Sequence, residues 1–188
     1  MDNQQEMLNE FEIGWLAGII DGEGSITLNV RKKHWKGWNG IGVDMKIIIV
    51  NTDGGIIDKV ISIMNKICIE PHLLEKGTNP IYSETGKTYH NPTKTMLVIT
   101  ISKMAELLKI LNLIQPHLSG EKKHRASIIM KFIERRQGRE TNRSKGGATW
   151  YDKYDWQLVG EFYKLSGGNL LPEVQQYLND HTQSRLAA

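Results

Sequence analysis

Residues 16–24 read Leu-Ala-Gly-Ile-Ile-Asp-Gly-Glu-Gly, and this stretch decides the fold. It ends a segment, residues 10–21, whose apolar residues recur at the spacing of an amphipathic helix: Phe11, Ile13, Leu16, Ala17 and Ile20. The Asp-Gly pair that follows predicts that the helix stops at Gly22. One acidic residue, Glu23, then lies in a turn between two glycines, where backbone can approach closely.

Two strands and a second helix are predicted next. Residues 25–31 alternate polar and apolar, as in a strand with one buried face, and residues 43–50 form its partner. The basic, glycine-rich residues 32–42 between them are interpreted as a turn. A helix then runs to about Ile67, with Thr52 or Asp53 as its N-cap.

The same order of elements repeats in the second half. Pro71 ends the helix, residues 72–75 and 95–101 are strands around a polar loop at 77–94, and Ser102 is expected to cap a helix. After Pro116, residues 121–137 form another helix; residues 138–149 are a basic loop, followed by two weaker helices. We therefore predict an α+β core over residues 8–137 with an antiparallel sheet, and a basic loop and C-terminal helical extension over 138–188.

Composition favours a globular protein. The chain has 188 residues, 39% hydrophobic and 24% charged, and its longest apolar runs are far too short to span a bilayer. The first residues carry neither the basic nor the apolar region of a signal peptide. Cys68, the single cysteine, lies in an apolar helical pattern, which predicts a buried thiol in a reducing compartment. The sequence contains no phosphate-binding loop, zinc-ligand spacing or serine-nucleophile motif.

Charge is distributed unevenly along the chain. Residues 1–24 carry six acidic and no basic residues, whereas residues 25–150 carry 21 Lys and Arg against 10 Asp and Glu. A basic middle segment favours a polyanionic partner such as nucleic acid. The alternative is an ordinary surface whose charge is unevenly spread.

Residues 16–24 resemble the LAGLIDADG motif of homing endonucleases, with six of nine positions identical. The differences are Ile19 for Leu, Gly22 for Ala (a common variant) and Glu23 for Asp. The predicted order αββαββα over residues 8–137 is also that of the family. The resemblance therefore implies an αββαββα LAGLIDADG core with a saddle-shaped antiparallel sheet, followed here by extra C-terminal helices.

The resemblance also implies a metal-dependent site. It assigns Glu23 as a catalytic metal ligand and the Gly22 carbonyl as a second ligand, with Mg²⁺ (or Mn²⁺) as the cation. Asn51 matches a polar residue that orients the site, and Lys122 a basic residue near the scissile phosphate, although adjacent Lys123 fits equally well. Asp21 is expected to be structural, fixing the turn by hydrogen bonds.

Only one copy of the motif is present, so the resemblance implies a homodimer joined through this helix. Small residues let two helices approach closely, and we expect Gly14, Ala17 and Gly18 at the interface. The apolar face of the helix would then form the dimer contact.

Double-stranded DNA is the expected partner, with one face of the sheet in the major groove. The candidate DNA-binding residues alternate along the strands or lie in the basic loops: Ser25, Thr27, Asn29, Arg31, Lys32, Lys33, Lys36, Asp44, Lys46, Lys76, Tyr82, Lys87, Lys94, Arg139 and Arg143. No membrane and no small-molecule substrate is expected.

The predicted function is site-specific, metal-dependent double-strand cleavage of a long pseudo-palindromic DNA site by an intron-encoded or freestanding endonuclease. The expected location is intracellular, with the host DNA, in a prokaryotic cytoplasm or an organelle. Two alternatives use the same fold: an intron RNA maturase, and a DNA-binding regulator that does not cleave. An intact acidic residue at position 23 favours cleavage.

Overall fold

A computed structural model describes residues 8–35, 38–77, 81–82, 88–90, 95–137 and 151–183. The helices are α1 (Glu10–Glu23), α2 (Gly54–Lys66), α3 (Met104–Ile114), α4 (Gly120–Gln137), α5 (Lys153–Ser166) and α6 (Pro172–Gln183), with a 3₁₀ turn η1 (Gln115–His117). The strands are β1 (Gly24–Trp35), β2 (Trp38–Asn51), β3 (His72–Lys76), β4 (Ile81–Tyr82), β5 (Thr88–His90) and β6 (Met96–Ile101).

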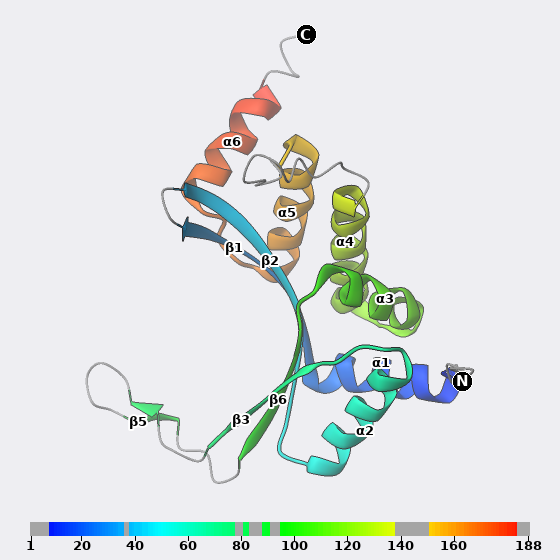
Figure 1. Ribbon diagram of the computed structural model, residues 1–188. Coiled ribbons are helices and arrows are strands. Elements are labelled where there is room, and N and C mark those ends of the chain that lie inside the picture. The colour runs from blue at the N-terminus through cyan, green and yellow to red at the C-terminus, as the bar shows by residue number, and fades with distance from the viewer. Residues whose placement is uncertain are drawn as a thin grey trace.

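The main sheet is antiparallel and has the strand order β1-β2-β6-β3, and β4 and β5 pair separately. In Figure 1 the sheet is curved: helices α1 to α5 lie on one side of it, and the opposite face is open. This arrangement confirms the predicted α+β class and the order αββαββα, with two further helices after α4.

Alternation along β1 and β2 explains why one face is covered. Ile26, Leu28 and Val30 are at most 9% exposed, and Ile47 and Ile49 on β2 are fully buried. The residues between them, such as Ser25 and Asn29, point to the open face. One face of the sheet therefore meets the helices, and the open face presents the polar side chains of β1 beside apolar residues of β2, such as Ile48.

Both strands of this ribbon are longer than predicted. Their pairing continues outward to Trp35 opposite Trp38, so the predicted turn over residues 32–42 is wrong. Ladder hydrogen bonds come from the backbone and do not require apolar side chains. A basic, glycine-rich segment can therefore extend a strand when the neighbouring strand supplies its backbone hydrogen bonds.

Helix boundaries follow capping chemistry. Asn9 and Glu12 form a capping box at the start of α1, and Asp53 caps α2 as predicted. Helix α1 does not stop at Gly22 but continues through Glu23. The predicted cap Ser102 is wrong, because α3 begins after Lys103 and has no side-chain cap.

Gly24 is required where α1 meets β1. A Cβ atom there would lie 2.8 Å from both Cα and O of Ile20, which is too close for any other residue. Cys68, just after α2, is exposed and has φ 52°, so the prediction of a buried thiol is wrong.

The C-terminal helices share the core of the rest of the chain. Trp156, Val159 and Phe162 on α5 and Val174 on α6 belong to the same buried cluster as the sheet residues. Asp155 is fully buried and forms ion pairs with Arg135 and Arg136 of α4. Among the residues that the structure describes, none of the helices is long and apolar enough to cross a bilayer.

Candidate active site and nucleic-acid interface

Glu23 is the last residue of α1, and both it and Gly22 are exposed. A Cβ on Gly22 would meet no atom within 4 Å, so the space beside Gly22 is open. Gly24 packs tightly on Ile20, which brings the start of β1 against the last turn of α1. Glu23 is therefore held at a defined point, beside the start of the open face of the sheet.

Lys122, from the first turn of α4, reaches the same helix end. Its Nζ donates to the carbonyl oxygen of Ile20 at 2.8 Å and to that of Asp21. Positive charge at a helix C-terminus is favourable, because the last carbonyls have no partner within the helix. Lys123 instead donates to the carbonyl of Pro116 at 3.1 Å. Of the two candidate lysines, Lys122 is the one beside Glu23.

Asp21 joins α1 to the start of α4. Its Oδ2 accepts from the backbone N–H of Ser119 at 2.9 Å and from the Ser119 hydroxyl at 2.7 Å. This matches the structural role expected of Asp21, although the hydrogen bonds reach a distant segment and not the local turn. Asp21 and Lys122 together fix the helix end that carries Glu23.

Asn51 ends β2 at the same end of the sheet. Gly24 pairs with Ile49, so Asn51 lies two residues further along, beside the end of α1. Its Oδ1 accepts from the backbone N–H of Asp53 at 2.9 Å and so orders the turn into α2. The side-chain oxygen therefore has a local structural role.

The oxygen donors at this helix end suit a hard divalent cation. Within the described residues, no group of three or more His, Cys, Asp and Glu side chains is placed to hold a metal. One chain offers the exposed Glu23 carboxylate and the carbonyls at the end of α1. Mg²⁺ is typically bound by one or two carboxylates, phosphate and water, so this set fits if nucleic acid supplies the remaining ligands.

The open face carries most of the DNA-binding candidates that the structure describes. Ser25, Asn29 and Arg31 on β1 are exposed there, and Thr27, Asp44 and Lys46 are partly exposed. Arg31 forms an ion pair with Asp44, and the Thr27 hydroxyl donates to the Lys46 carbonyl at 3.3 Å. Lys76 shares this face. Side chains alternate along β3, so Lys76 lies on the same side as His72, four residues earlier, and His72 pairs with Thr100.

Lys32 differs from the candidates on the open face. It alternates with Arg31 and so lies on the helix-covered side, where it pairs with Glu173 of α6. Its role in DNA binding stays a prediction. The remaining candidates have side chains outside the described part of the chain: Lys33, Lys36, Tyr82, Lys87, Lys94, Arg139 and Arg143.

A cavity of about 490 Å³ beside the open face adds two residues that the sequence analysis missed. Ser102 and Lys103 line it together with Arg31, Lys46 and Asp44. Lys103 also donates to Glu106, and this contact raises the pKa of the Lys103 ammonium. A lysine two residues after the end of β6, beside the open face, is the pattern that could have identified it.

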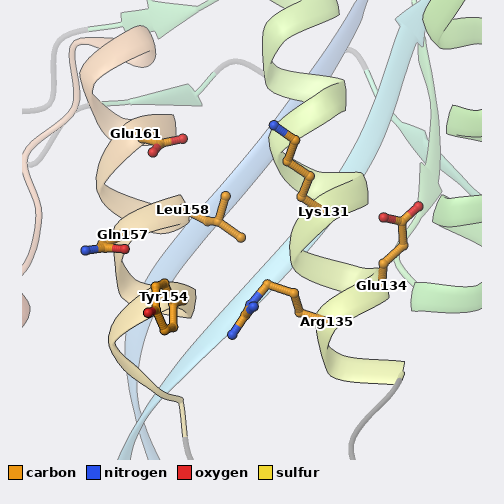
Figure 2. A pocket seen from close by; sticks show the side chains of 7 residues that line it. All are labelled: Lys131, Glu134, Arg135, Tyr154, Gln157, Leu158 and Glu161. Atoms are coloured by element: carbon orange, nitrogen blue, oxygen red, sulfur yellow. The ribbon is translucent and has the colours of Figure 1, made fainter.

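A second cavity, of about 300 Å³, lies between α4 and α5 and is shown in Figure 2. Its charged lining is balanced, with Lys131 and Arg135 against Glu134 and Glu161. Arg135 is also paired with Asp152 and so is already partly neutralised. We assign this cavity no role.

One face of α1 is largely open within the described residues, although Lys59 of α2 lies over the Phe11 ring. A Cβ on Gly14 or Gly18, as on Gly22, would meet no atom within 4 Å, and Phe11 on the same face is 69% exposed. Ala17 differs, because it is only 1% exposed and packs in the core of its own chain. The prediction that Ala17 and the most apolar helix face form the dimer contact is therefore wrong: that face is internal.

Comparison with known proteins gives a fold. No protein-family model matches the sequence, and no curated protein matches it significantly. Among solved structures, the archaeal intron-encoded homing endonuclease I-Vdi141I complexed with DNA is 17% identical, with a TM-score of 0.60, over 94% of this chain and 98% of that one. The homing endonuclease I-CvuI in complex with a DNA target is 15% identical, with a TM-score of 0.57, over 91% and 94%.

A third neighbour is longer. The LAGLIDADG meganuclease I-CpaMI bound to uncleaved DNA is 16% identical, with a TM-score of 0.59, over 94% of this chain but only 52% of that one. At these identities the likeness concerns architecture. The chain has the LAGLIDADG homing endonuclease fold.

Proposed function

We propose that the chain is a site-specific DNA endonuclease of the homing type, which cuts both strands of a long pseudo-palindromic duplex as a symmetric dimer. One observation carries the proposal: an exposed carboxylate, Glu23, stands at a rigid helix end beside the uncovered, polar face of a curved sheet. The neighbours I-Vdi141I and I-CvuI are themselves described as DNA complexes. No observation on this chain favours an RNA maturase or a regulator over cleavage.

The open face would lie along the major groove. Ser25 and Asn29 have the polar side chains that read base edges, and Arg31, Lys46 and Lys103 are cations suited to bases or phosphates. Asp44 would keep Arg31 extended across the ribbon through their ion pair. The strands would thus supply sequence recognition, and the cavity lined by Lys46 and Lys103 would bind backbone phosphate.

Glu23 and the Gly22 carbonyl would hold a divalent cation, Mg²⁺ or Mn²⁺. When bound, such a cation supplies Lewis acidity and neutralises charge at the phosphate. Lys122 adds a fixed positive charge at the same helix end and would stabilise the charge that develops on phosphate oxygen. The glycines around Glu23 leave space for the sugar-phosphate backbone.

A duplex has two strands to cut, and each chain supplies one Glu23. The uncovered stripe of α1, formed by Phe11, Gly14, Gly18 and Gly22, is suited to close packing against its own copy. Such packing would place two Glu23 residues near one axis. Each would then serve one strand.

The proposal is tested by incubating the purified chain with a library of randomised duplexes and sequencing the cut ends. We expect double-strand breaks whose two cuts are related by a two-fold axis. Cleavage should stop in EDTA and return with Mg²⁺ or Mn²⁺, while DNA binding persists in EDTA at low salt. Cleavage that continues in EDTA would contradict the metal assignment. DNA binding without cleavage in either Mg²⁺ or Mn²⁺ would refute the proposed nuclease activity.

Lys122→Met is expected to slow cleavage by about a hundredfold to a thousandfold, the usual effect of removing one positioned donor from a charged transition state. Because Lys122 also caps α1, the variant should lose about 0.5 to 1 kcal/mol of stability, measured by urea unfolding. Lys123→Met is the matched control and should cut at the wild-type rate, since the Lys123 ammonium donates to the carbonyl of Pro116 and not to the end of α1. Equal rates for all three proteins would place the helping cation elsewhere.

A further inference from the structure

Among the described residues, no third strand lies beside the outer half of the β1–β2 ribbon. Strand β6 pairs with β2 only from Ile47 to Asn51, whereas β1 and β2 continue together to Trp35 and Trp38. An isolated two-stranded ribbon is marginally stable and free to twist. Yet this part carries Asn29, Arg31 and Asp44 on the open face. Contacts other than those with a third strand must therefore set the orientation of this part of the ribbon.

Two tyrosine hydroxyls hold the ribbon from both edges. Val30 pairs with Val43, and the backbone N–H of Val30 donates to the Tyr163 hydroxyl at 3.0 Å, while that of Val43 donates to the Tyr151 hydroxyl at 3.1 Å. In an antiparallel ladder, alternate pairs turn their N–H groups outward, away from each other. The two hydroxyls therefore bind one rung of the ladder at its opposite ends.

The tyrosines are themselves rigidly held. The Tyr151 ring packs 5.0 Å from Trp156 and 6.1 Å from Phe132, between centroids, and the Arg136 guanidinium lies 4.5 Å from its centroid. Tyr163 is on α5, beside the buried residue Phe162. In Figure 1, α5 lies alongside the upper part of β1 and β2. Both tyrosine rings are partly buried and pack against the core.

A third contact lies further along β1. Lys32 pairs with Glu173 near the start of α6, and the hydrogen bond from Lys32 holds the pKa of the Glu173 carboxyl below its usual value. Both side chains are about half exposed, 56% and 49%, so this ion pair adds little stability by itself. It does, however, join α6 to β1 at the residue next to Arg31.

We infer that the C-terminal helices set the curvature of the β1–β2 ribbon and thereby its sequence discrimination, with Tyr151 and Tyr163 as positioning residues. This inference rests on the proposed function, because it names what tunes recognition by the same face. Asn29 and Arg31 flank Val30, and Asp44 follows Val43, so a shift of that rung moves all three side chains. We call the contacts of Tyr151, Tyr163 and the Lys32–Glu173 pair with the ribbon the brace. Recognition of base pairs at the outer part of each half-site would depend on the brace. Recognition of inner base pairs would depend on the four-stranded part of the sheet.

The test compares the double variant Tyr151→Phe, Tyr163→Phe with the matched control Tyr154→Phe. Each change removes only a hydroxyl; Tyr154 is on the same helix α5, and its described contacts are made by its ring. For every single-base change in the selected duplex, relative cleavage is measured. We expect discrimination at outer positions to fall by about fivefold to tenfold, inner positions to change by less than about twofold, and the control to match wild type.

Two further measurements keep the outcomes separate. Amide hydrogen exchange of Val30 and Val43 should accelerate in the double variant and not in the control. A protein that binds DNA without cutting would refute the proposed nuclease, but outer and inner discrimination could still be read from binding. An equal loss of discrimination at all positions would refute the inference. So would unchanged discrimination despite faster amide exchange at Val30 and Val43.

The charge exchange Lys32→Glu with Glu173→Lys tests the third contact. If Lys32 acts through α6, either single change should reduce outer discrimination and the exchanged pair should restore it. If Lys32 instead binds phosphate, the exchanged pair will bind DNA as poorly as Lys32→Glu alone, and Lys32 is removed from the brace.

Discussion

Glu23→Gln is expected to slow DNA cleavage by about a thousandfold or more while changing DNA affinity by less than about threefold. Glutamine keeps the size of the side chain but loses the negative charge that a divalent cation requires. Within the described residues, the Glu23 carboxylate takes part in no hydrogen bond or ion pair, so its loss removes no structural contact. The free energy of unfolding should therefore change by no more than about 0.5 kcal/mol.

Glu10→Gln is the matched control for this result. Glu10 is on the same helix, its side chain is 88% exposed, and it lies at the opposite end from Glu23. The same chemical change there should leave the cleavage rate unaltered. Single-turnover cleavage and equilibrium binding, measured on the selected duplex, separate the two effects. A Glu23→Gln protein that retains a tenth or more of the wild-type rate would refute the assignment of Glu23.

The same experiment addresses the two alternatives that the fold allows. A DNA-binding regulator would bind one duplex tightly and cut it in neither Mg²⁺ nor Mn²⁺, so Glu23→Gln would have no measurable effect. An RNA maturase would prefer a structured intron RNA over duplex DNA at equal salt. An exposed carboxylate beside an open face can hold the cation that cleavage requires, which is why the nuclease is preferred.

The sequence was sufficient to predict the core of the fold. Periods of 3.6 and 2 residues locate α1 and β1, because one face of each element must be buried: Leu16 and Ile20 in α1, Ile26 and Leu28 in β1. Asp53 was predictable as a cap because its carboxylate can satisfy the first N–H groups of a helix. These features depend on neighbours in sequence, which a sequence displays directly.

Features that depend on distant contacts were not predictable. Lys32 looks like a DNA-binding residue of a basic hairpin, and it is the continuation of β1 through Lys32, with Glu173 of α6 beside it, that shows it faces the helices. Lys122 and Lys123 are adjacent and chemically identical, and what separates them is which one reaches the end of α1. The hydroxyls of Tyr151 and Tyr163 bind backbone, so their role leaves no pattern in side-chain types.

Small residues on α1 show the same limit. Ala17 and Gly18 are neighbours in a stretch that is apolar on several sides, and periodicity does not say which side meets the core of the same chain. The structure places Ala17 inside and Gly18 outside, in open space. That distinction turns a general expectation of helix pairing into a test at a single residue.

Gly18→Leu is expected to abolish dimer formation and, with it, double-strand cleavage. A leucine at this position meets nothing in its own chain, since even a Cβ has no atom within 4 Å. Replacing glycine inside a helix should in fact stabilise the folded chain by about 0.5 to 1 kcal/mol. Against a second α1, however, the added side chain would separate two backbones that glycine allows to touch.

Sedimentation velocity at micromolar concentration should show a dimer for wild type and a monomer for Gly18→Leu. The melting temperature of wild type should rise with protein concentration, and that of the variant should not. Melting temperature depends on protein concentration only when the folded chains associate. Gly54→Leu is the control: Gly54 is the first residue of α2 and is equally open, but it is on another helix, so dimer and cleavage should persist. A Gly18→Leu dimer that still cuts both strands would show that the two Glu23 sites meet through some other surface.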